Sequence, residues 1–171
     1  AAWSTALGYT YGVSDIEVAG VVYPASADRR HVIDAMAGVS VWRGLRAAAA
    51  FTSMTGAPFT RAYSRSPQDC TAFGFGCDDP TGSYIDEHNA QRTPAYRSLD
   101  VSALWSQPLA GVDVRAYVQV RNVLGRDNAS TYAGSGPAGR VQRSDGMHII
   151  WEDRFERGLP RMPLVGLRVA F

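Results

Sequence analysis

Two cysteines are the residues whose type and spacing most directly suggest covalent chemistry. Cys70 and Cys77 lie seven residues apart, between polar and proline-containing stretches. An oxidising compartment would join such a pair across a loop as a disulfide, and two free thiols in a reducing compartment are the alternative. A metal site is the weaker interpretation, because no second pair of cysteines or histidines lies at ligand spacing. We therefore predict a disulfide between these residues.

The histidines and the clustered acids form no recognisable ligand set. His31, His88 and His148 are scattered, so we interpret them as polar residues of a surface or a lumen. Four acidic residues gather in one long connection, but their spacing does not fit the EF-hand pattern. A solvated loop explains them better than a calcium site, and we predict neither a metal nor a cofactor. The four residues are Asp78, Asp79, Asp86 and Glu87.

Catalysis and nucleic-acid binding are also disfavoured. No Gly-x-Ser-x-Gly elbow occurs, and no nucleophile, base and orienting group form a convincing set, so we do not expect an enzyme. The net charge is +1, and the 17 basic residues, all of them arginines, form no stripe of the kind that nucleic acid requires. The longest purely apolar run, residues 47–51, is far shorter than the ~18 residues of a membrane-spanning helix.

The chain does contain segments in which apolar and polar residues alternate. Six such segments have roughly the 9 to 11 residues that a tilted strand needs to cross a bilayer. The third is the weakest, because its run of four alanines would suit a helix equally well. The six segments are residues 3–13, 30–41, 45–55, 96–105, 112–121 and 163–171.

The alternation gives each segment one apolar side and one side that can be wet, because successive side chains of a strand point to opposite faces. In a barrel the wet side would face the lumen. Cross-strand pairing along the barrel wall is the expected role of charges on that side, and contact with a ligand is the alternative. The lumen-facing charges are Asp34, Asp100, Asp113, Arg115, Arg121 and Arg168.

Short and long connections alternate strictly between the six segments. Residues 43–44 and 107–111 form tight turns, whereas residues 14–29, 61–94 and 125–160 form long loops. Soluble sheets also alternate in hydropathy, but an up-and-down barrel has turns at one rim and loops at the other. We therefore predict an all-β fold, an antiparallel up-and-down meander of about six strands that belongs to a larger transmembrane β-barrel.

Aromatic residues gather near both ends of the expected strands, as two interfacial belts require. Trp42 breaks the parity of its segment, and its place beside a turn is the only explanation that the sequence offers. The turn ends hold Trp3, Trp42, Trp105 and Phe171, and the loop ends hold Tyr9, Tyr11, Phe59, Tyr63 and Tyr96.

Five blocks, in order, resemble the C-terminal end of a TonB-dependent outer-membrane receptor. Each block alone is a weak pattern, but their order, their spacing and the terminal Phe171 together carry the resemblance, which covers most of the chain. The blocks are residues 28–31, 55–60, 92–101, 120–128 and 158–163.

The resemblance implies a 22-stranded barrel in the bacterial outer membrane, with an N-terminal plug and with nutrient uptake driven by a TonB complex. The nutrient would be a siderophore, cobalamin or a glycan, and Phe171 would be the aromatic read by the barrel-assembly machinery. Residues 1–171 would then be the C-terminal part of the receptor, without its plug and upstream strands. The expected partners are outer-membrane lipid, the remaining strands and plug, the TonB complex and the assembly machinery.

Two other classes of protein remain open from the sequence. A complete eight-stranded barrel, acting as an adhesin or a structural protein, would need two more strands, for which residues 17–22 and 147–151 are available. A soluble secreted β-sandwich would bury the apolar sides of its strands against each other. The position of the apolar sides in the folded chain therefore separates these classes.

Overall fold

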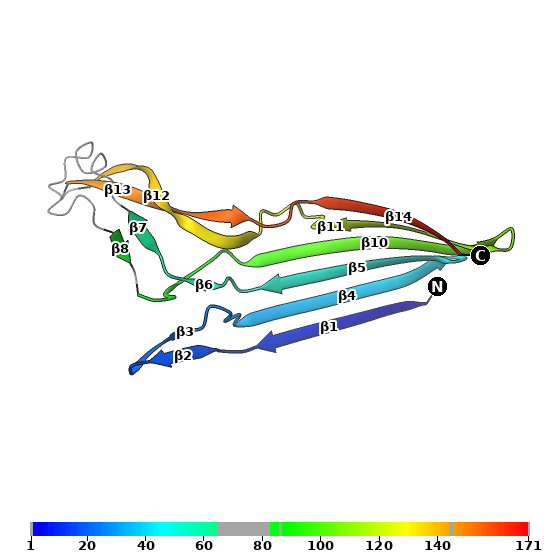
Figure 1. Cartoon of the computed structure of the whole chain (residues 1–171), viewed down its shortest axis with the longest axis horizontal. Helices are drawn as coiled ribbons and strands as arrows, with labels where there is room; N and C mark the ends of the chain where they lie inside the picture. Colours follow the sequence, from blue (N-terminus) through cyan, green and yellow to red (C-terminus); the bar gives the residue numbers. More distant parts are fainter. Residues whose placement is uncertain (1, 65–82, 86, 144–145, 171) are drawn as a thin grey trace.

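The computed structural model describes residues 2–64, 83–85, 87–143 and 146–170, which form strands and connections without a helix. Six strands make one antiparallel sheet, in the order β1-β4-β5-β10-β11-β14 (Figure 1). Strands that follow one another along the chain in this set also lie side by side, so the sheet is an up-and-down meander. The six strands are β1 (Trp3–Tyr11), β4 (His31–Trp42), β5 (Leu45–Met54), β10 (Tyr96–Leu109), β11 (Val112–Arg121) and β14 (Met162–Ala170).

All six expected segments are confirmed as strands of this sheet. The four alanines of residues 47–50 lie in β5, between β4 and β10. Hydrogen bonding to a neighbour on each side therefore overrides the helix preference of alanine, which is a weak local bias. In the part of the chain that the structure describes, no helix is long and apolar enough to cross a membrane.

Two tight turns join strands at one end of the sheet, which we call the turn rim. Gly44 follows β4 with a φ of 75°, and a Cβ there would lie 2.0 Å from the carbonyl oxygen of Ser106, so the turn requires glycine. Ala110 and Gly111 connect β10 to β11 with φ values of 51° and 85°, as in a type I′ hairpin. The expected turn over residues 107–111 was too long, because β10 continues to Leu109.

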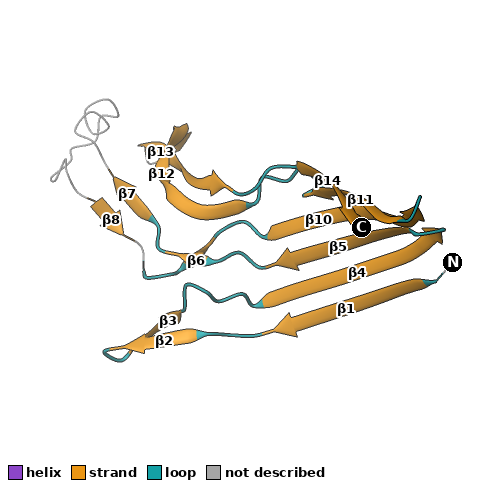
Figure 2. Cartoon of the chain, turned by 45° about the vertical axis from the view of Figure 1, so that its right-hand side comes forward, coloured by secondary structure: helices purple, strands orange, loops and turns teal. Residues whose placement is uncertain are grey.

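The long connections leave from the opposite end, the loop rim, and contain shorter strands of their own (Figure 2). The prediction of a loop over residues 125–160 is wrong, because most of this segment forms the β12–β13 hairpin. Three shifts of register accommodate the glycines and the proline of β12, whose composition had indicated a loop. The added strands are β2 (Asp15–Val18), β3 (Val21–Pro24), β6 (Pro58–Phe59), β7 (Ala62–Ser64), β8 (Ser83–Ile85), β9 (Gln91–Arg92), β12 (Ala129–Arg143) and β13 (Gly146–Arg157).

The two segments available for an eight-stranded barrel are both extended, but neither joins the six-stranded sheet. Residues 17–22 belong to the β2–β3 hairpin, and residues 147–151 lie in β13, which pairs with β12. Both hairpins lie beyond the loop rim, so their strands extend the connections and do not widen the sheet (Figure 1).

The six-stranded sheet is a single layer, and the described residues have almost no apolar core. Phe59 is the one buried hydrophobic side chain among the residues described. The accessible surface is 11843 Å², whereas a compact folded protein of this mass would expose about 8,200 Å². The burial that stabilises a soluble domain is therefore absent from this sheet.

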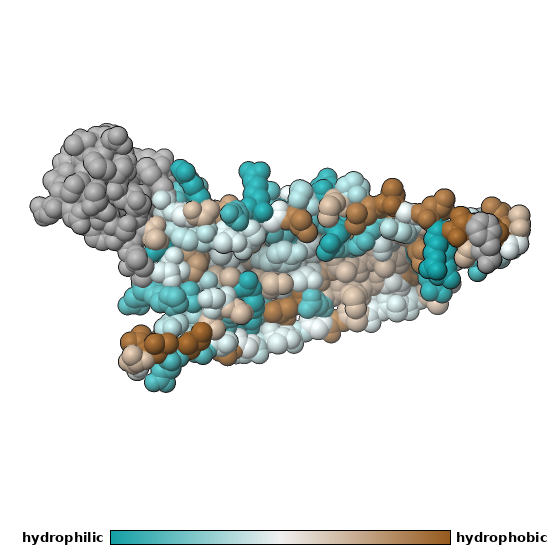
Figure 3. Space-filling view, viewed as in Figure 1, coloured by the Kyte–Doolittle hydropathy of each residue, from teal (hydrophilic) through white to brown (hydrophobic). Residues whose placement is uncertain are grey.

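The strand registers place the apolar sides of all six strands on one face, the apolar face. Val118 lies opposite Val165, and Trp3 lies opposite Val39, in rows that run across the sheet. Leu7 and Val165 are exposed by 79% and 78%, so no second layer covers this face as a β-sandwich would require. Figure 3 shows apolar residues gathered near the turn rim and at the β2–β3 hairpin.

Trp42 also lies on the apolar face, and a β-bulge explains its parity. Ser40 pairs with Arg46, whereas Trp42 pairs with Leu45, so the pairing passes over Val41. A bulge adds one residue to one strand and so reverses the alternation beyond it. Trp42 therefore joins the row of Leu45 and Trp105 near the turn rim.

Two aromatic residues expected at the loop end of the apolar face lie elsewhere. Phe59 is 8% exposed and packs between Tyr132 and Phe155, with ring centroids 4.3 and 5.6 Å away. Tyr96 pairs with Met54, which lies on the polar face with Ala48 and Thr52. The expectation of an interfacial position is therefore wrong for Phe59, because the β12–β13 hairpin folds over it.

Candidate functional site

The second face of the sheet carries the charges that the sequence predicted for a lumen, and we call it the polar face. The registers bring all six of them onto this one face, on four of the six strands. Asp34 comes from β4, Asp100 from β10, three charges from β11, and Arg168 from β14. The three charges of β11 are Asp113, Arg115 and Arg121.

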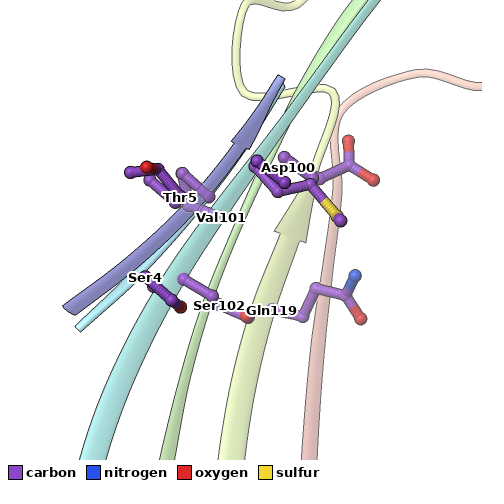
Figure 4. Close-up of a pocket in the computed structure, with 13 residues that line it drawn as sticks. Ser4, Thr5, Asp100, Val101, Ser102 and Gln119 are labelled. Atoms are coloured by element: carbon purple, nitrogen blue, oxygen red, sulfur yellow. The ribbon is translucent and has the colours of Figure 1, made fainter. Parts of the chain in front are cut away.

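The middle of the polar face is hollow, with a cavity volume of about 390 Å³. Its lining residues are mostly small, and they come from β1, β4, β5, β10 and β11. Figure 4 shows Ser4, Ser102 and Gln119 around this hollow, on β1, β10 and β11. Small side chains keep the backbone within reach, so a body that fills the hollow could approach the sheet closely.

In the half of the polar face next to the loop rim, each carboxylate has a partner. Thr52 Oγ1 donates a hydrogen bond of 2.8 Å to Asp34. Asp100 accepts hydrogen bonds of 2.9 Å from both Ser98 Oγ and the Asn122 backbone N–H. Arg121 Nε also lies 3.5 Å from Asp100, which makes a cross-strand ion pair. Asp100 and Arg121 thus make the kind of cross-strand pair that the sequence predicts for charges on this face.

The half next to the turn rim differs, because its arginines have no ion pair with a described residue. Arg115 lies directly opposite Arg168 in the β11–β14 pairing, and Arg46 lies two strands away on β5. None of the three is within ion-pair distance of a carboxylate in the described part of the chain. All three side chains are exposed. For Arg115 and Arg168 the expected cross-strand pairing with a carboxylate is therefore not present among the described residues.

Above the loop rim, a first polar cluster joins the β1–β4 and β5–β10 connections around Asp28, which is only 2% exposed. Arg92 forms an ion pair with the Asp28 carboxylate, and Arg30 Nε lies 3.4 Å from it. The Ser14 backbone N–H donates to the same carboxylate at 3.2 Å. The hydrogen bond from Arg92 is the main reason that the pKa of Asp28 lies below its usual value.

The same cluster also holds backbone from the next connection. Arg92 Nη1 donates hydrogen bonds of 3.1 Å to the Gly56 carbonyl and 3.3 Å to the Asp28 carbonyl. Arg29 is half-buried beside it, and burial together with the charge of Arg92 lowers the pKa of Arg29. Three of the five blocks that carry the family resemblance therefore meet at this one cluster.

A second cluster at the loop rim is built on two buried asparagines. Asn122, with a φ of 50°, donates hydrogen bonds of 2.9 Å to the Arg126 carbonyl and 3.1 Å to the Leu159 carbonyl. Asn128 accepts from the Arg97 backbone N–H at 2.9 Å and donates back to the Arg97 carbonyl at 3.0 Å. The side-chain amides therefore join residues 92–101, 120–128 and 158–163 by hydrogen bonds to backbone groups, as strand pairing would do in a sheet.

A third cluster attaches the β12–β13 hairpin to the rest of the loop rim. Arg61 Nε donates to both carboxylate oxygens of Asp153, at 2.8 and 3.1 Å, and Ser135 Oγ donates at 2.6 Å. Burial would raise the pKa of Asp153, but these hydrogen bonds outweigh it and the pKa lies below its usual value. With the aromatic packing of Phe59, this ion pair fixes the base of the hairpin.

The described histidines take structural positions. His31 Nδ1 lies 2.9 Å from the Tyr9 hydroxyl, and the ring packs 5.1 Å from Tyr11, at the loop end of the apolar face. His88 Nδ1 lies 3.2 Å from Thr60 Oγ1 and packs edge-on to Tyr23. Within the described ranges, no three His, Cys, Asp or Glu residues lie close enough to hold a metal ion.

Several predicted site residues cannot be placed, and others were missed. Cys70, Cys77 and Phe171 lie outside the described residues. Asp28, Asn122 and Asn128 were not among the predicted site residues, although all three are buried at the loop rim. An available signal was an asparagine directly after a strand, because asparagine tolerates the left-handed conformation that ends the pairing.

The fold and site together define a class: a one-layer antiparallel sheet with an apolar face, a charged polar face and a rim of loops held by polar clusters. Comparison with known proteins does not extend this description. No family model matches the chain, and no curated protein and no solved structure is significantly similar to it.

Proposed function

We propose that the chain forms the C-terminal strands of the β-barrel of a TonB-dependent outer-membrane receptor. The observation that carries the proposal is the uncovered apolar face, on which Trp3, Leu7, Val165 and Leu167 are each exposed by 70% or more. An exposed apolar face that runs across six strands marks contact with a membrane or a partner. Acyl chains fit this face, because its side chains come from strands of the length that crosses a bilayer.

The edges of the sheet support a barrel larger than this chain. Among the described strands, β1 and β14 are the two edges of the sheet and each pairs with one neighbour. Unpaired backbone groups inside hydrocarbon cost several kcal/mol each, so an open sheet of six strands is not stable in lipid. Neighbouring strands of a parent barrel would pair with both edges. The resemblance gives 22 as the number of strands.

The proposed roles follow from the two faces. The apolar face contacts lipid, the polar face lines the interior, and the loop rim, with its three polar clusters, faces the outside of the cell. The parent receptor would take up a nutrient of the siderophore, cobalamin or glycan class, driven by a TonB complex that contacts the upstream part. Phe171 would be the residue read by the barrel-assembly machinery.

A pair of substitutions at adjacent positions tests the membrane assignment in the full parent protein. Val118→Arg places a charge on the apolar face near mid-strand, at a cost of about 2–4 kcal/mol in lipid. Gln119→Arg places the same charge on the polar face and is the matched control. The first variant should lose heat-modifiable gel mobility in outer-membrane fractions, and the second should keep it.

Two results would contradict this proposal. Equal tolerance of Val118→Arg and Gln119→Arg would show that the apolar face does not meet lipid. A parent reading frame without a plug domain and further strands upstream of Ala1 would remove the receptor assignment, even if the chain were confirmed as part of a membrane barrel.

A further inference from the structure

Three arginines concentrate positive charge on the polar face next to the turn rim. Arg115 and Arg168 form a directly opposed pair on β11 and β14. Arg46 lies on β5 in the row of Leu104 and Tyr117, two residues along β11 from Arg115. Like charges directly opposite each other on a sheet are destabilising unless another charge offsets them.

The described strands supply little to offset this charge. Among the described residues on this half of the polar face, the one carboxylate is Asp113, which lines a small recess of about 50 Å³ with Arg115 and Arg168. It is not within ion-pair distance of either arginine. The carboxylates of the other half, Asp34 and Asp100, are held by Thr52 and Arg121. An anion from outside these strands is therefore the natural counter-charge.

The spacing of the arginines favours an extended ligand over a single anion. From β5 to β14 the sheet has three inter-strand gaps, which amount to about 14 Å at the usual strand separation. One phosphate group cannot span this distance, whereas an extended peptide covers it in roughly four to five residues. A cavity of about 350 Å³ lined by Arg46, Leu104, Ser106 and Arg115 provides space for side chains of such a peptide.

We propose that Arg46, Arg115 and Arg168 form a docking surface for an acidic polypeptide segment held inside the barrel. The proposal rests on the proposed function, because it places the polar face in the barrel interior. Each guanidinium offers a planar fork of donors that matches a carboxylate bidentately. An acidic segment on this surface would orient whatever fills the barrel against its final strands, close to the periplasmic rim.

Photo-crosslinking from Tyr117 in the intact parent protein tests this docking. Tyr117 lies on the polar face two residues from Arg115, and its ring covers Gly166, so a benzoylphenylalanine there keeps an aromatic ring on the polar face. Membranes that hold the heat-modifiable barrel would be irradiated, and the attached peptide identified by mass spectrometry. The expected product carries at least two Asp or Glu residues within about five positions.

Charge reversal then separates docking from mere proximity. The double variant R115E/R168E should lower the yield of this product by about tenfold or more, and reversing the acidic residues of the attached peptide should restore it. R43E, at the turn beyond the strands, is the matched control and should leave the yield unchanged. Full barrel formation without a peptide adduct, or with an adduct that R115E/R168E does not affect, would overturn the docking but not the receptor assignment. A parent protein without a heat-modifiable barrel would overturn both.

Discussion

At the loop rim, four of five buried polar residues hydrogen-bond to other segments and Ser98 bonds to Asp100 of its own strand, whereas at the turn rim three exposed arginines have no ion pair in the described chain. The five are Asp28, Asn89, Ser98, Asn122 and Asn128. Buried polar groups must be satisfied internally, so those of the loop rim have a structural purpose. The exposed charges of the turn rim have no such constraint, which leaves them available to an external partner.

Acid pH should produce the largest difference in stability between the loop rim and the turn rim. The pKa of Asp28 is lowered, so its contribution to stability is present above the unfolded value of about 3.9 and is lost as the pH falls through the lower folded value. Limited proteolysis of the loop over residues 12–30 should therefore accelerate in that acid range. Arg92→Met should make this loop sensitive already at neutral pH. A loop that stays resistant in Arg92→Met would show that the Asp28 cluster does not hold it.

Asn122→Ala should destabilise the loop rim by about 3 kcal/mol, because it removes the part-buried hydrogen bonds from the side-chain amide to the carbonyls of Arg126 and Leu159 and puts alanine at a positive φ. Asn122→Gly removes the same hydrogen bonds without the backbone strain. The difference between the free energies of unfolding of the two variants, measured in urea, gives the backbone strain at this position. Equal stability of wild type and Asn122→Ala would contradict the role given to the side-chain amide.

Asp100→Asn and Asp113→Asn compare one carboxylate from each half of the polar face. The first should cost about 1 kcal/mol of the free energy of unfolding, because it weakens the ion pair with Arg121. The second should cost less than about 0.5 kcal/mol, since Asp113 is exposed and makes no ion pair among the described residues. Similar losses from both variants would show that the two halves do not differ.

Arg115→Gln should have the smallest effect on stability, within about 0.5 kcal/mol of wild type, because the exposed guanidinium makes no ion pair in the described part of the chain. Its removal relieves the opposition to Arg168, so a slight gain at low ionic strength should disappear in 1 M salt. A loss of 2 kcal/mol or more in urea unfolding would mean that Arg115 has a structural partner.

The six-stranded sheet was predicted closely from the sequence. Alternation located all six strands and the faces of their side chains, and the charges from Asp34 to Arg168 accordingly share one face. Composition failed for residues 125–160, where glycine and proline indicated a loop but β12 and β13 pair through three shifts of register. The position expected for Phe59 was also wrong, because its burial depends on partners that are more than 70 residues away.

Apart from Trp42, the sequence by itself determined which residues lie on each face of the six strands, because the two-residue period of a strand is a local property of the backbone. Tertiary structure decided which segments meet at the loop rim. The Asp28–Arg92 ion pair joins residues 64 positions apart, and the Asn122 amide reaches the carbonyl of Leu159. It also decided that Trp42 lies on the apolar face, since the bulge that places it there exists only in the pairing of β4 with β5.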